Sequence, residues 1–311
     1  MNYFSNTLLA NSTASNYNSK INKWVSIMPQ NENSLQFIYS NPNYSVVQLR
    51  QYLVETNVDT AQTLNSYIKA IFSVVEHNKE LFSNIKPEKY NKATQRWKEL
   101  RQKTFEYANA YRYEQRPSPT QSQKFGSSLK FNELESIRDE LPDDSIDKLL
   151  LGFYTYVPPV RADFFATQIV RTGEKPSYAN YILYDDNKSH LVLTDFKTSE
   201  LYKEISYDLP YELHRLLNIS LKDKPRRFLF MNRFGQSFKR NKFSEWTTKR
   251  LTALFNKQFT LTLFRHIYIS SLPPDTNAEV LFEISKKMGH SITQHMLYRW
   301  REQPDKIVEV D

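Results

Sequence analysis

Apolar residues in the first part of the chain recur with the spacing of amphipathic helices. One such pattern covers residues 60–76, where Asp59 is placed to cap the predicted helix, and another opens at Pro87 and continues to about Tyr113. The residues expected to face a core are Leu64, Tyr67, Ile68, Ile71, Phe72 and Val75 in the first helix and Trp97, Leu100, Tyr107 and Tyr111 in the second. Residues 1–30 are rich in Asn and Ser without any period, which predicts a mobile tail. Residues 31–115 therefore form a predicted all-α domain.

The pattern changes after RPSPTQSQKFGSSLK, residues 116–130, a stretch of Pro, Ser, Gln and Gly that indicates a linker. Helices are predicted at 131–140, 145–157, 210–219, 244–257 and 277–288. Two further short helices are predicted, one that carries Arg265 and can be capped by Thr260, and one that carries Tyr298. Between them, NYILY, HLVLTDF and KEISYDL alternate like strands over residues 180–208. Residues 131–311 are thus predicted to form an α+β domain, mainly helical with a small antiparallel sheet.

Charge and composition narrow the classes of function. The 311 residues contain 42 Lys and Arg against 34 Asp and Glu, a net charge of +8, which favours an anionic partner, with nucleic acid ahead of a membrane surface. The absence of Cys excludes disulfides, Cys-ligated zinc and a thiol nucleophile. We find no P-loop, no zinc-ligand spacing and no Asp/Glu cluster for a two-metal nuclease, so we expect no metal and no cofactor. No apolar run is long enough for a membrane helix and the N-terminus does not resemble a secretory signal, so we expect an intracellular protein, in the cytoplasm or the nucleus.

Five residues at the ends of predicted elements carry candidate chemistry: Arg161, Lys197, Arg265, His290 and Tyr298. Each has an ordinary structural explanation when taken alone. The first could pair with a neighbouring Asp, the second could lie at a hairpin tip, and the last is one of 20 tyrosines. Their order along the chain is more informative: an Arg after two prolines, a Lys between two strands, an Arg-His pair, a Gly-His pair and a Tyr.

That order resembles the tyrosine recombinase family, the phage-type integrases. The motifs that carry the resemblance are YTYVPPVRADFF, TDFKTSELYKEISYDLP, LTLFRHIYIS and KKMGHSITQHMLYRW, which together span roughly residues 125–300. The resemblance implies a tyrosine-recombinase-like catalytic domain at 131–311 and a core-binding-like DNA domain at 31–115. It further implies a site-specific recombinase that acts on double-stranded DNA as a homotetramer on paired sites, to integrate or excise a virus or mobile element.

The resemblance also assigns roles to the five residues. Arg161, Arg265 and His290 would donate hydrogen bonds to the scissile phosphate, whose charge grows in the transition state. Tyr298 would attack the phosphorus and form a 3′-phosphotyrosyl bond, and Lys197 would protonate the departing 5′ oxygen. The reaction would need neither a metal nor ATP.

The sequence departs from the family pattern three residues before Arg265, where the usual His is replaced by Thr262. A hydroxyl cannot take up a proton near neutral pH, so the role is either spread over several groups or supplied elsewhere. The candidates are Thr262 itself, His266, and His295, which lies three residues before Tyr298.

Two basic groups are candidate phosphate contacts, although a charged helix face is also simply a solvated one. They are Lys89, Lys92, Arg96 and Lys103 in the helical domain, and Arg233, Lys239, Arg240 and Lys242 in the catalytic domain. Three other interpretations stay open: strand cutting and resealing as in a type IB topoisomerase, a catalytically inactive DNA-binding relative, and a helical interaction protein.

Overall fold

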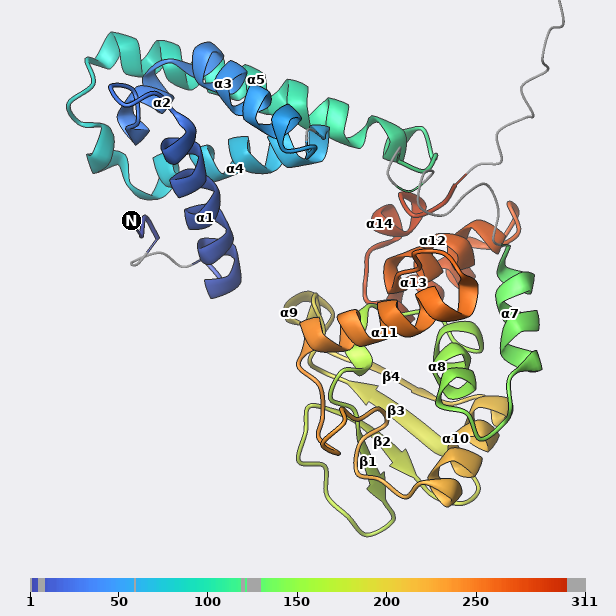
Figure 1. The fold of residues 1–311 in the computed structure, drawn as a ribbon. Coiled ribbons are helices and arrows are strands. Elements are labelled where there is room, and N and C mark those ends of the chain that lie inside the picture. Colours follow the sequence, from blue (N-terminus) through green and yellow to red (C-terminus); the bar gives the residue numbers. More distant parts are fainter. Residues whose placement is uncertain (1, 5–8, 59, 119–120, 122–129, 301–311) are drawn as a thin grey trace, which may run out of the picture. The chain divides into compact units, whose positions relative to one another are not determined.

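The computed structural model describes residues 2–4, 9–58, 60–118, 121 and 130–300, and the chain divides into two compact units, Met1–Tyr111 and Arg112–Asp311 (Figure 1). The division falls near the C-terminal end of a long helix. Most of the predicted linker at 116–130 lies outside the described residues. The two units are described separately.

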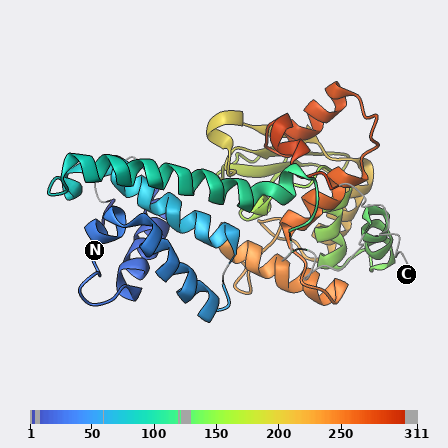
Figure 2. The same ribbon diagram turned by 90° about the horizontal axis from the view of Figure 1, so that it is seen from above.

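The N-terminal unit is all-α, with a long C-terminal helix that is plain in Figure 2. Its elements are α1 (Asn11–Ile27), α2 (Leu35–Ser40), α3 (Pro42–Glu55), α4 (Ala61–His77), the 3-10 helix η1 (Lys79–Phe82) and α5 (Pro87–Tyr113). Thr60 caps α4, accepting a hydrogen bond from the backbone of Thr63, whereas Asp59, which we expected as the cap, lies outside the described residues.

Two tryptophans from distant helices organise the core of this unit. Trp24 and Trp97 meet edge to face with ring centroids 5.8 Å apart, and their indole N–H groups donate to the carbonyls of Ser45 and Tyr39. Because Trp24 is fully buried on α1, the prediction of a mobile tail over residues 1–30 is wrong for residues 11–27. Polar residues on the outer face of α1 hid its apolar stripe. The prediction that Tyr107 faces the core is also wrong, since its side chain is 77% exposed.

The C-terminal unit combines helices with one sheet. Its helices are α7 (Phe131–Glu140), α8 (Ile146–Thr155), the 3-10 helix η2 (Ala162–Phe164), α9 (Ser199–Tyr202), α10 (Tyr211–Asp223), α11 (Arg240–Phe255), α12 (Leu261–Ser271), α13 (Ala278–Lys287) and α14 (Ile292–Met296). The strands are β1 (Gln168–Arg171), β2 (Asn180–Tyr184), β3 (Ser189–Leu193) and β4 (Ile205–Asp208).

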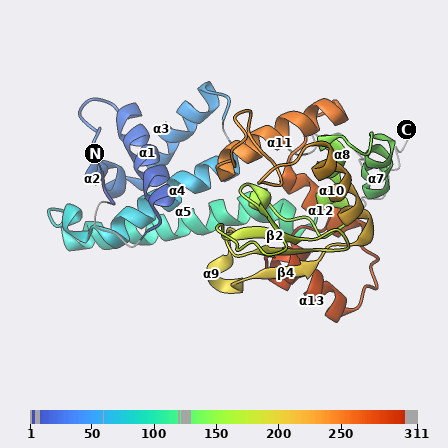
Figure 3. The same cartoon turned by 90° about the horizontal axis from the view of Figure 1, so that it is seen from below.

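The sheet has the order β1-β2-β3-β4 and is mixed, because β1 runs parallel to β2 while the other pairs are antiparallel. The prediction of a purely antiparallel sheet is therefore wrong for β1. A four-residue strand is only about 13 Å long, so the eight residues between β1 and β2 suffice to lead the chain back without a helical crossover. At the other edge α13 contacts β4 (Figure 3).

A single hydrophobic core joins the sheet to the helices of this unit. Strand residues Ile182, Leu191 and Ile205 and helix residues Phe153 and Phe264 belong to one buried cluster. This shared core fixes the ends of α8, β3 and α12 relative to one another. In the described part of the chain, no helix has the length and apolarity that crossing a membrane requires.

Candidate active site

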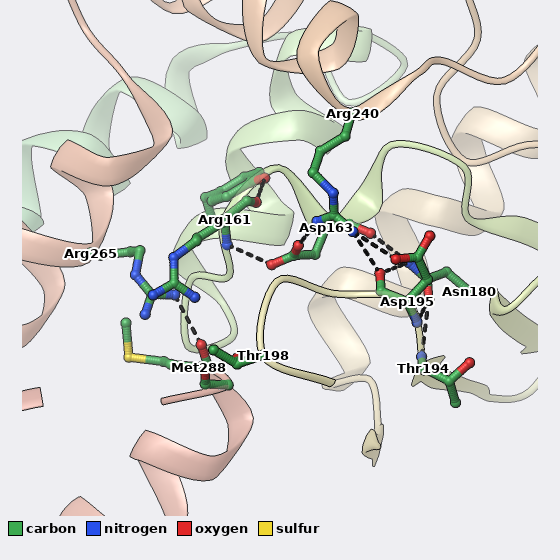
Figure 4. Close-up of polar contacts among 11 residues, drawn as sticks. Arg161, Asp163, Asn180, Thr194, Asp195, Thr198, Arg240, Arg265 and Met288 are labelled. Atoms are coloured by element: carbon green, nitrogen blue, oxygen red, sulfur yellow. Dashed lines mark hydrogen bonds and ion pairs between the residues drawn. The ribbon is translucent and has the colours of Figure 1, made fainter. Parts of the chain in front are cut away.

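Arg161 is presented from a rigid turn between α8 and η2. The backbone N–H of Arg161 donates to the Asp163 carboxylate at 3.1 Å, and its carbonyl accepts from the hydroxyl of the buried Tyr154 at 2.8 Å. Burial raises the pKa of Tyr154 well above its usual value, so that hydroxyl stays protonated and can donate. The half-buried side chain of Arg161 is therefore held at its backbone end while its guanidinium reaches toward Arg265 (Figure 4).

Asp163 is itself clamped by Arg240, at the start of α11. One guanidinium nitrogen of Arg240 binds the buried Asp163 carboxylate and the other binds Asp195, at 2.9 Å from its carboxylate and 3.1 Å from its carbonyl (Figure 4). We expected Arg240 to contact DNA, but the structure engages its guanidinium with protein carboxylates. This clamp joins the Arg161 turn to the segment that leads into Lys197.

Replacing Arg240 with Ala should lower the free energy of unfolding by about 2–3 kcal/mol, because it leaves the Asp163 carboxylate buried without its cation. Urea unfolding measures the loss. The matched control is Lys242→Ala, which breaks an exposed pair with Glu245 on the same helix and should change stability by no more than about 0.5 kcal/mol. Equal losses in the two variants would contradict a structural role for the clamp.

Arg265, in the middle of α12, is fully buried. Its Nη1 group donates to the carbonyls of Pro159 and Met288, both at 3.0 Å, and its Nη2 group donates to Nδ1 of His290. Its buried Nε–H has no partner within the described residues. Neither Arg265 nor Arg161 forms an ion pair with a carboxylate in that part of the chain. Burial lowers the pKa of Arg265 to about 10, so the side chain is still a cation at neutral pH.

His290 follows a tight turn that ends α13. Gly289 has φ +63°, and a Cβ there would lie 3.1 Å from the Phe196 ring and from Ile205, so the turn requires glycine on both counts. The hydroxyl of Thr198 donates to the Gly289 carbonyl at 2.6 Å. Because Phe196 and Thr198 both contact Gly289, the exposed Lys197 between them is held next to the His290 turn, in the connection between β3 and β4 as we predicted.

The Tyr298 segment is fastened along α12. Nδ1 of His266 lies 2.8 Å from the Tyr298 carbonyl, the Trp300 N–H donates to Ser270 Oγ at 2.8 Å, and the Arg299 guanidinium donates to a carbonyl at the end of α12. The His266 ring stacks on Trp300 with centroids 4.4 Å apart. Tyr298 lies in the turn after α14 and not within a helix as predicted.

The Tyr298 ring brings the candidate residues together. It stacks on His290 with centroids 5.5 Å apart, and the Arg265 guanidinium lies 4.9 Å from its centre. Burial alone would raise the pKa of Tyr298, but the charges of Arg265 and Arg161, together with their hydrogen bonds to the phenol, outweigh burial and lower that pKa below its usual value. The arrangement therefore makes the phenolate of this tyrosine easier to form than that of a free tyrosine.

The histidines form a chain whose tautomers follow from their partners. Nδ1 of His290 accepts from Arg265, so its proton is on Nε2, which donates to Nδ1 of His295 at 3.2 Å. The proton of His295 is then on Nε2, which is buried and has no partner in the described residues. Burial, reinforced by the charge of Arg265, lowers the pKa of His290 to about 2 and of His295 to about 4. Both rings are therefore neutral at pH 7.

His266 is hydrogen-bonded to the Tyr298 carbonyl and is also neutral at pH 7, since burial lowers its pKa from 6.5 to about 4. Between pH 6.5 and pH 4 the His266 ring is protonated in the unfolded chain but stays neutral in the folded chain. The contribution of His266 to the free energy of unfolding is therefore complete above pH 6.5 and falls as the pH decreases toward 4. His266→Asn retains an amide donor for the Tyr298 carbonyl but cannot titrate. We expect its loss of unfolding free energy from pH 7 to pH 4.5 to be smaller than the parent's by about 2–3 kcal/mol. Equal losses in denaturant titrations would contradict a neutral buried His266.

Comparison with known proteins shows a distant likeness to solved structures. No protein-family model matches the chain, and no curated protein matches it. A crystal structure of XerA recombinase is similar to it, with 13% sequence identity and a TM-score of 0.42 over 96% of this chain and 90% of that chain.

Most of the other predicted site residues are exposed. Thr262, in the first turn of α12, is exposed. Lys89, Lys92 and Lys103 are exposed on α5, while Arg96 is bound to Asn43 and Glu99. Arg233 and Lys239 are exposed, and Lys242 pairs with Glu245. The described residues include no group of three or more His, Asp or Glu side chains placed to hold a metal ion.

Several positioning groups were missed from the sequence. They are the carbonyls of Pro159 and Met288, the side chains of Asp195 and Thr198, and the Trp300 ring. Backbone acceptors leave no signal in side-chain patterns. Trp300 had a weak signal, since it directly follows the Tyr298 segment.

Proposed function

We propose that the protein cleaves and rejoins DNA strands through a covalent bond between Tyr298 and a DNA phosphate. One observation carries the proposal: a tyrosine of lowered pKa lies against two guanidiniums, Arg161 and Arg265, that no carboxylate neutralises within the described residues. Two such cations repel each other unless an anion joins them. A phosphodiester supplies that anion and the atom that a phenolate attacks.

The unpartnered Nε–H of Arg265 supports the proposal further. It shares an edge of the guanidinium with Nη2, so this edge can donate two parallel hydrogen bonds to phosphate oxygens. Nη1 is already fixed by two carbonyls, which holds the guanidinium in place before DNA arrives. We assign the phosphate contacts to Arg161 and Arg265. We assign His290 the role of orienting Arg265, because both of its ring nitrogens already have hydrogen-bond partners.

The step balances without a co-reactant. Tyr298 reacts as the phenolate, after its hydroxyl has released its proton. The phenolate oxygen forms a bond to phosphorus, the bond from phosphorus to the 5′ oxygen breaks, and Lys197 protonates that oxygen as it leaves. Lys197 suits this role because its exposed side chain comes from the loop fastened to Gly289, beside His290. A 5′ hydroxyl from another strand reverses the step. We extend the proposal to site-specific recombination by four protomers on paired sites, for integration or excision.

A covalent trap tests the proposal. The full chain is mixed with nicked duplexes taken from the DNA that flanks its own gene, so that the short fragment released by cleavage diffuses away. After denaturation we expect a DNA-linked protein band, with the DNA joined through its 3′ phosphate and the modified peptide containing Tyr298. Salt-dependent DNA binding without any adduct would favour the inactive relative, and linkage to a 5′ phosphate would contradict the mechanism.

A further inference from the structure

A second cationic site lies at the β1 edge of the sheet, away from Tyr298. An open cavity of about 500 Å³ is lined there by Gln168, Ile169, Arg171, Glu174, Lys175, Ser177 and Arg227. Three of these side chains are cationic and one is acidic. None of the three cations forms an ion pair in the portion of the chain that the structure describes. The cavity therefore carries net positive charge.

Arg227 is held ready on the wall of this cavity. Its guanidinium lies 5.4 Å from the centre of the Tyr178 ring and 5.6 Å from that of Phe228. Its Nη2 group donates to Ser177 Oγ at 2.9 Å, and Ser177 donates in turn, through its hydroxyl and its N–H, to the side-chain oxygen of the buried Gln168. The two ring contacts and the hydrogen bond restrain the guanidinium, which lowers the entropy cost of binding an anion.

The acidic residue of the cavity is tied to the turn that follows β1. Glu174 accepts a hydrogen bond from the backbone N–H of Arg171 at 2.9 Å, and the neighbouring Gly173 adopts φ +87°. The carboxylate thus holds the turn that carries Arg171 and Lys175. The backbone of Ile169 donates to the Arg227 carbonyl at 2.8 Å, which fastens the opposite wall to β1.

We propose that this cavity binds phosphate groups. A planar guanidinium with further N–H donors besides the one bound to Ser177, together with two further cations, matches the several oxygens of a phosphate better than a single carboxylate. The site is distinct from the Tyr298 centre, because the strand next to Gly289 is β4, three strand spacings or about 14 Å across the sheet from β1. The phosphates could belong to duplex DNA beyond the cleavage point, which would rest on the proposed function, or to a free polyphosphate.

Pyrophosphate is the probe for the free anion. Its binding to the full chain is measured by calorimetry in an Arg161→Gln background, which weakens anion binding at the Tyr298 centre. We expect Arg227→Gln to weaken pyrophosphate binding by about tenfold or more, and Arg227→Lys by less, because lysine keeps the charge but loses the fork. The matched control is Lys222→Gln, which removes an exposed cation of the same unit that lies outside the cavity.

Duplexes of increasing length distinguish the two sources. If DNA is the source, Arg227→Gln should weaken binding of long duplexes several-fold, leave short ones unchanged and reduce the salt dependence by about one phosphate contact. If a free polyphosphate is the source, only pyrophosphate binding should fall. Unchanged affinity for both ligands, in a variant that unfolds at the parent's temperature, would overturn the proposal. Adduct formation at Tyr298 is scored separately, so failure of this site would leave the proposed function standing.

Discussion

Replacing Tyr298 with Phe is expected to abolish the covalent DNA adduct and to leave DNA affinity within about twofold of the parent, since phosphate contacts dominate affinity. The substitution removes one oxygen and keeps the ring that stacks on His290 and faces Arg265. A phenylalanine ring has no oxygen that could form the bond with phosphorus. The trapping assay with nicked duplexes measures the adduct, and a filter or gel assay measures binding.

Tyr268→Phe is the matched control. Tyr268 lies on α12, three residues after Arg265, but burial raises its pKa to about 12. It is therefore a poor nucleophile at neutral pH, and its replacement should leave the adduct yield unchanged. An adduct that persists in Tyr298→Phe and disappears in Tyr268→Phe would show that the wrong tyrosine was chosen.

Local patterns predicted the elements that carry the candidate site. The helical spacing around Arg265 and before Gly289 is confirmed by α12 and α13. Alternation of apolar residues predicted the two strands on either side of Lys197. The structure confirms them as the antiparallel strands β3 and β4. These features depend on residues close together in the chain, and such short-range periodicity is what a single sequence records.

Long-range partners could not be predicted in the same way. Arg240 reaches Asp163 across 77 residues, and His266 reaches the Tyr298 carbonyl across 32. In the sequence Arg240 is one of several basic residues and His266 is one of six histidines. Only the fold shows that the first is a structural clamp and that the second holds the backbone of Tyr298. The buried face of α1 could not be predicted for a related reason, because Trp24 on this face packs against Trp97 on the distant helix α5.

Arg265→Lys is expected to reduce the rate of adduct formation by about 10²- to 10³-fold, the cost typical of losing one preorganised donor to a developing oxyanion. A lysine ammonium cannot donate to Pro159, Met288 and His290 while also presenting a two-donor edge to phosphate. The loss of the two carbonyl contacts should also lower the free energy of unfolding by about 2–4 kcal/mol. The rate is measured under single-turnover conditions at saturating protein, at a temperature where the variant stays folded.

A methylphosphonate at the scissile position separates charge stabilisation from structural damage. This substrate lacks one negative charge at phosphorus, so less transition-state charge remains for a guanidinium to stabilise. If Arg265 acts on the phosphate, the deficit of Arg265→Lys relative to the parent should shrink by about tenfold or more on this substrate. A deficit that stays constant would mean that Arg265 acts only through the position of Tyr298. Arg161→Lys should show the same shrinkage with a smaller loss of stability, because its half-buried guanidinium is not bonded to the carbonyls that hold Arg265.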